Sequence, residues 1–88
     1  FILDTLGWVM FKKGDYKKAV EILEKAHLMQ PEVSIIAEHL GDAYFKLNMH
    51  EKAKAKFLKA EELESDDLRK KEIQQKVVIT ENSIKSVR

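Results

Sequence analysis

One frame of residues recurs after 34 positions, and this recurrence limits what the chain can fold into. Leu6-Gly7 returns as Leu40-Gly41, and the spacing of the apolar residues around them, three and four apart, predicts helices. Further identities at the same spacing join Ala19 to Ala53, Ala26 to Ala60, Lys12 to Lys46, Lys18 to Lys52 and Lys25 to Lys59. A period of this length predicts two stacked helical hairpins.

Gly7 and Gly41 occupy the same phase of two predicted helices, although glycine in a helix costs about 1 kcal/mol relative to alanine. We therefore expect a second helix to lie against each glycine, too close for a Cβ. The small residues opposite are expected to be Ala19, Ala26, Ala53 and Ala60. Large residues should fill the surrounding core: Leu6, Met10, Leu23, Leu40, Tyr44 and Phe57.

Breaker and capping residues divide the chain into five predicted helices, over residues 2–13, 16–29, 33–47, 50–63 and 68–88. Gly14 and Asn48 tolerate the left-handed conformation that ends a helix. Asp15 is a natural N-cap, and Pro31 cannot continue the hydrogen-bond ladder. The segment Ser65-Asp66-Asp67 supplies an N-cap for the fifth helix.

The repeated frame resembles the tetratricopeptide repeat family, whose pattern is W-x2-L-G-x2-Y, then A-x3-F and a closing P. The resemblance covers roughly residues 1 to 65 and implies an all-α, right-handed helical-hairpin solenoid. We expect a single domain, residues 1–88, with repeats at 1–33 and 34–67 and a capping helix at 68–88, cut from a longer protein. The run Asp4-Thr5-Leu6-Gly7-Trp8 is similar to bacterial members, several of them envelope-associated; the sequence leaves the compartment unknown, and this similarity only favours bacterial cytoplasm or envelope.

The last segment departs from the repeat, because a third copy would place Leu-Gly at Gln74-Gln75. It nevertheless carries one stripe at helical spacing, namely Ile73, Val77, Thr80, Ile84 and Val87. This pattern is typical of a helix that covers the end of a repeat array. The alternative is a free amphipathic helix that docks on a partner or a membrane.

Composition excludes several classes of function. The formal net charge of +1 argues against a dedicated nucleic-acid binder, and no apolar run reaches the roughly 18 residues of a membrane span. With no cysteine there is no thiol metal site. We predict no cofactor and no metal site, because Glu38, His39 and Asp42 share one helical face as exposed charges would. No catalytic motif is present, so we predict that the chain is not an enzyme.

By resemblance to the family, one face of the first and third helices lines a concave groove that holds an extended peptide or a partner helix. Its aromatic residues suit apolar side chains of a partner, and its carboxylates favour a basic or amide-rich ligand. We call this set the candidate groove: Asp4, Trp8, Phe11, Lys12, Glu38, Asp42, Phe45 and Lys46. The alternative is that Trp8 and Phe45 extend the core or cover the fifth helix, while the charges form a solvated face.

Two further expectations concern partners. Some family members grip a C-terminal carboxylate with a Lys/Asn/Arg clamp, but the matching places here hold Asp4, Trp8, Ile35 and His39, which argues against that role. Ile2 and Val9 lie on a flank with no preceding helix, so we expect an exposed edge. A lost helix or a second copy of the chain would cover it. The predicted function is a protein–protein interaction module, with a structural or self-associating element as the alternative.

Overall fold

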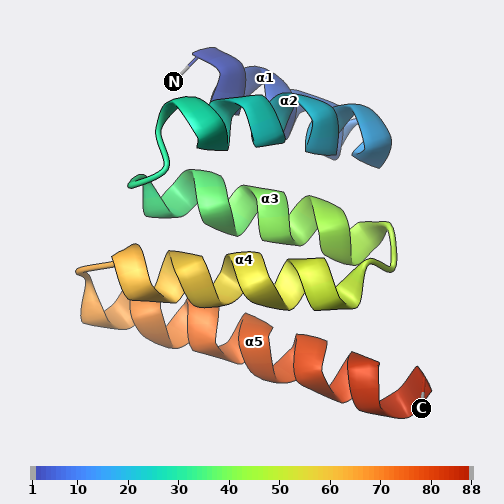
Figure 1. Ribbon diagram of the computed structural model, residues 1–88, viewed down its shortest axis with the longest axis vertical. Helices are drawn as coiled ribbons and strands as arrows, with labels where there is room; N and C mark the ends of the chain where they lie inside the picture. The colour runs from blue at the N-terminus through green and yellow to red at the C-terminus, as the bar shows by residue number, and fades with distance from the viewer. Residues whose placement is uncertain (1, 88) are drawn as a thin grey trace.

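The computed structural model describes residues 2–87, with side chains to residue 86, and it contains five helices in this range and no strand. They are α1 (Ile2–Lys12), α2 (Tyr16–Met29), α3 (Ser34–Lys46), α4 (His50–Leu63) and α5 (Asp67–Val87). Figure 1 shows them stacked in chain order. The predicted all-α helical-hairpin repeat is confirmed, and the predicted helix ends differ from the observed ones by one residue or none.

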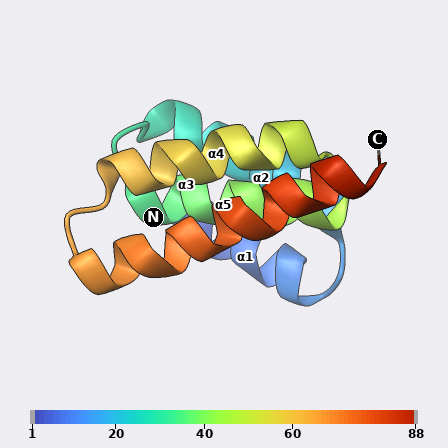
Figure 2. The ribbon, with the colours of Figure 1, turned by 90° about the horizontal axis from the view of Figure 1, so that it is seen from below.

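Each helix packs mainly against its neighbours in the chain, α1 on α2, α2 on α3, α3 on α4 and α4 on α5. Seen from below, α2 and α4 lie along one side, α1 lies on the opposite side, and α5 crosses the view diagonally (Figure 2). This arrangement brings side chains of α1, α3 and α5 together on one face. No helix within residues 2–87 is both long enough and apolar enough to cross a bilayer.

The helix ends follow the capping residues that the sequence contains. Gly14 and Asn48 have φ of 87° and 61°, the left-handed conformation expected after α1 and α3. Asp15 Oδ1 accepts a hydrogen bond of 3.2 Å from the Lys18 amide and so caps α2. Asp66 caps α5, because its Oδ1 accepts from the Leu68 amide at 2.9 Å.

The two helical glycines do permit close packing, but their contacts differ from the prediction. A Cβ on Gly7 would lie 2.6 Å from Cγ of Leu23, and one on Gly41 would lie 2.7 Å from the ring of Phe57. The glycines therefore make room for large side chains of the next helix. The prediction that alanines lie directly opposite was wrong, although Ala19, Ala26, Ala53 and Ala60 are all buried.

The core is centred on α3, which has helices on both sides. Leu40 is 1% exposed and Phe57 is 2% exposed, and the flank residues Ile36 and Ala43 are fully buried. Leu6 was expected in the core like its counterpart Leu40, but it is 42% exposed. That expectation was wrong because, within residues 2–87, α1 packs on only one side.

The fifth helix covers the second hairpin with the predicted stripe. Ile73 and Thr80 are fully buried, Val77 is 8% exposed and Ile84 is half-buried, while the side chain of Val87 lies outside the described residues. The Thr80 hydroxyl donates to the Lys76 carbonyl at 2.7 Å, so burying this polar side chain leaves its hydroxyl paired.

Candidate partner-binding groove

An aromatic stack links α1 to α3 within the candidate groove. The Trp8 ring is stacked on Phe11, with centroids 4.4 Å apart, and on His39, with centroids 3.9 Å apart. The ammonium of Lys12 lies 5.2 Å from the Trp8 centroid, within cation–π range. Nδ1 of His39 is 3.0 Å from Oδ1 of Asp4, which is itself only 15% exposed. These contacts hold Trp8 in a fixed orientation at a half-buried site.

The carboxylates of α3 meet cations of α5. The Glu38 side chain is 4% exposed, and its two oxygens accept from Arg69 Nη2 and from Lys76 Nζ, the latter at 2.7 Å. Lys76 Nζ also donates to Asp42 Oδ2 at 3.1 Å, and Arg69 Nη1 to Glu72 Oε2 at 2.8 Å. Glu38 was expected to face a ligand, but in this structure it lies beneath α5.

The protonation of this cluster reflects burial and pairing acting in opposite directions. Burial raises the pKa of Asp42, and the charge and hydrogen bond of Lys76 only partly offset this. Burial alone would lower the pKa of Lys76, but its hydrogen bond to Glu38 and the charge of Asp42 outweigh that effect and raise it. Lys76 therefore stays charged at neutral pH. The ionised form of Asp42 is less favourable in the folded chain than in water, because burial removes part of its hydration.

This raised pKa gives a testable pH dependence. Protonated Asp42 contributes stability that is fully present below the unfolded-state pKa, about 3.9, and lost as pH rises through the higher folded-state pKa. The free energy of unfolding of Asp42→Asn, relative to the parent, should thus increase between about pH 3 and 7. Urea titrations followed by circular dichroism measure it.

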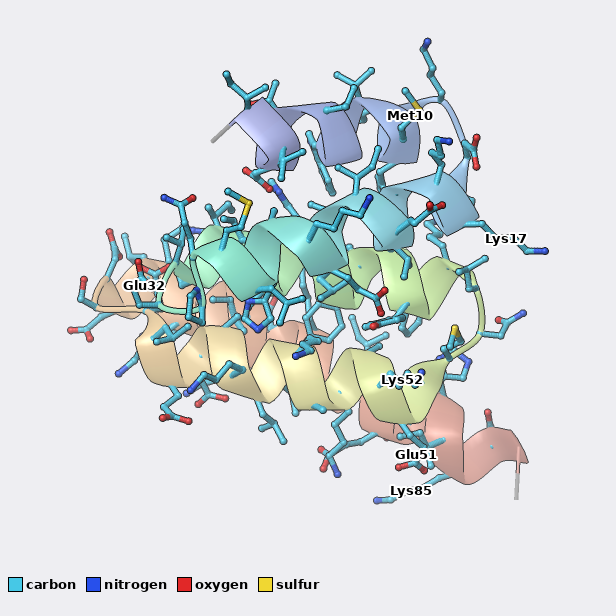
Figure 3. All side chains as sticks on the ribbon, turned by 45° about the horizontal axis from the view of Figure 1, so that its top comes forward. Met10, Lys17, Glu32, Glu51, Lys52 and Lys85 are labelled. Atoms are coloured by element: carbon cyan, nitrogen blue, oxygen red, sulfur yellow. The ribbon has the colours of Figure 1, made fainter. Side chains whose placement is uncertain are left out.

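The control for this pH dependence is Glu32→Gln, which removes an exposed carboxylate at the periphery of the molecule (Figure 3). The raised pKa of Asp42 would be contradicted if the free energy of unfolding of Asp42→Asn, relative to the parent, did not change with pH or fell as pH rises.

Phe45 lies in the second part of the candidate groove, beside a hollow of about 240 Å³ between α3 and α5. The ring is half-buried and makes an edge contact with His50, with centroids 4.9 Å apart. The hollow is lined by three apolar residues, Phe45, Phe57 and Ile79, and by four polar or charged ones, Asp42, Lys46, Lys76 and Thr80.

The predicted site residues therefore divide into two groups. Trp8, Phe11 and Phe45 are half-buried on the face shared by α1, α3 and α5, with Lys12 and Lys46 exposed beside them. The acidic members instead make contacts within the chain, Asp4 with His39 and Glu38 and Asp42 with α5. No three histidine, aspartate or glutamate side chains in the described range converge as metal ligands.

The predicted edge of α1 is exposed. Ile2 is 85% and Val9 42% exposed, and Ile2 also helps to line a hollow of about 460 Å³, with Leu3, Ala26, Met29 and Gln30. This hollow lies between the start of α1 and the end of α2.

Sequence reasoning missed Arg69 and Lys76, and it also missed the stacking of His39 on Trp8. The repeat period contains part of the signal, because Asp42 and Lys76 are 34 residues apart and Asp4 and His39 are 35 apart. Residues about one period apart on α1, α3 and α5 are thus neighbours across this face.

The fold and this face define a class of protein, a helical-hairpin repeat scaffold whose exposed side chains are available to other proteins. The tetratricopeptide repeat profile matches residues 2–32 and 37–67, and the chain belongs to the tetratricopeptide repeat family. Its repeats are generally protein–protein interaction modules and typically non-catalytic. A comparison with curated proteins gave no match.

Proposed function

We propose that the chain binds an extended peptide or a helix of another protein on the face formed by α1, α3 and α5. The observation that supports this most is the set of half-buried aromatic residues, Trp8, Phe11 and Phe45, together with the hollow between α3 and α5 that Phe45 helps to line. Aromatic rings held in place by stacking lose little conformational freedom on binding, and they dominate binding energy at interfaces. Residues 1–33 and 34–67 act as the two repeats and 68–88 as the helix that covers them.

The experiment is selection of peptides from a random phage library on the purified chain, followed by measurement of their affinity for variants. Trp8→Ala and Phe45→Ala should each weaken binding by about tenfold or more. Leu28→Ala removes an 81% exposed leucine from α2 and should leave affinity unchanged. Selected peptides that bind both groove variants as tightly as the parent would contradict the proposal.

A second candidate function is self-association through the α1 edge, supported by the exposure of Ile2 and Val9 and the adjoining hollow. It predicts a molar mass by light scattering that rises with concentration in the absence of any partner. Ile2→Glu with Val9→Glu should return the mass to that of a monomer. A monomer at every concentration would exclude this function without affecting the groove proposal.

A further inference from the structure

The charge of the candidate groove, once α5 is in place, differs from the charge that its sequence suggests. Each of its carboxylates is engaged within the chain, because Asp4 contacts His39, Glu38 contacts Arg69 and Lys76, and Asp42 contacts Lys76. Glu38, Asp42 and Glu72 thus each have a cationic partner within the described residues, and Asp4 has the imidazole of His39.

Two cations of the same face have no carboxylate partner among the described residues, namely Lys12 and Lys46. Both are exposed, and Lys12 contacts only the face of the Trp8 ring. They lie in the last turns of α1 and α3, at equivalent positions of the two repeats, and so at the same end of the face. The charge available to a ligand there is therefore positive, and an anionic ligand is favoured.

The hollow beside Lys46 has the size and lining of a site for one side chain. Its volume of about 240 Å³ lies below the roughly 300–1,000 Å³ of sites that bind whole small molecules. Phe57 contributes to its lining and is 2% exposed, while Ile79, also in the lining, is 55% exposed and thus open to a partner. The Thr80 hydroxyl donates to the Lys76 carbonyl and the Lys76 ammonium to Asp42, so these three polar residues of the lining are paired within the chain, while Phe45, Phe57 and Ile79 supply apolar surface.

We propose that the partner of this face is an acidic segment carrying one large apolar side chain. The apolar side chain occupies the hollow between Phe45, Phe57 and Ile79, and neighbouring carboxylates of the segment pair with Lys46 and Lys12. This inference rests on the proposed function, and it adds the sign of the ligand charge and the place of its anchor. A basic segment is disfavoured because the carboxylates it would need are already paired within the chain.

The test uses three labelled decapeptides titrated into ¹⁵N-labelled protein and followed by amide chemical shifts. One is built of glutamate and glycine with a central phenylalanine, the second has lysine for glutamate, and the third has alanine for phenylalanine. The acidic phenylalanine peptide should bind most tightly, shift the amides of Phe45, Lys46 and Ile79, and lose affinity as salt rises.

The role of the two lysines is tested with the double variant Lys12→Glu, Lys46→Glu. It should bind the acidic phenylalanine peptide about tenfold more weakly than the parent does. The control is Lys17→Glu, the same charge change at an exposed lysine of α2 that points away from the molecule (Figure 3), and it should have no effect. Circular dichroism confirms that both variants fold.

The remaining outcomes separate the two proposals. If the lysine peptide binds more tightly at the same amides, the acidic partner is wrong while the groove stands. If the alanine peptide binds as tightly as the phenylalanine peptide, the anchor in the hollow is wrong. If none of the three shifts these amides up to about 5 mM, where even millimolar affinity is visible, the inference fails, while the proposed function is decided by the library selection.

Discussion

Phe57→Ala is expected to lower the free energy of unfolding by about 4 kcal/mol. Phe57 is 2% exposed, and its ring packs directly against Gly41, where a Cβ would collide with it. Removing the ring opens a cavity between α3 and α4. Since a small domain is stable by only about 5–15 kcal/mol, the variant should unfold at much lower urea concentration.

The matched control is the adjacent Leu58→Ala, which truncates a side chain that is 45% exposed. It should change the free energy of unfolding by less than about 1 kcal/mol. Equal effects of the two substitutions in urea titrations would contradict the central position of Phe57 and the packing of Gly41 against it.

The second large effect is expected when both cations around Glu38 are removed. Arg69→Met with Lys76→Met leaves a carboxylate that is 4% exposed without a compensating charge, which should cost about 3 kcal/mol. The low end of the usual range applies because the two cations are themselves about one third exposed. Urea titrations should show the loss as a lower midpoint.

A third substitution distinguishes a buried unpaired charge from a simple loss of packing. Glu38→Met, added to the double variant, removes the charge and should recover more than half of the lost stability, because a buried ionic cluster and an apolar cluster of similar volume are about equally stable. A triple variant that is no more stable than the double one would show that charge is not the cause.

The helices could be predicted from the sequence because their determinants are local. Gly14, Asp15 and Asn48 fix the helix ends through their own backbone and side-chain chemistry, and the period of 34 residues places the two hairpins in register. Which side chain meets Gly41 could not be read from the period. It depends on how far α4 is shifted along its axis relative to α3, and the repeated alanines fitted the pattern as well as Phe57 did.

Helical phase groups the residues of the candidate groove, but it does not give their partners. The aromatic residues Trp8, Phe11 and Phe45 are all half-buried, and Phe11 and Phe45 pack against the core. The partners of Glu38 lie 31 and 38 residues further along the chain, on a helix whose sequence departs from the repeat. With no repeat to fix its register, α5 gave no basis for assigning Arg69 and Lys76 to the acidic residues of α3.

The stack in Figure 1 is open, since the helices pack mainly in chain order and, within residues 2–87, α1 and α5 do not form one of the main helix–helix interfaces. Stability in such a molecule is the sum of contributions from successive neighbours, without a last contact that locks the whole. Fraying can thus begin at either end while α3 and α4 remain folded together. A ligand that touches α1, α3 and α5 at once would supply a long-range link that the polypeptide itself lacks, and would couple the two ends into one cooperative unit.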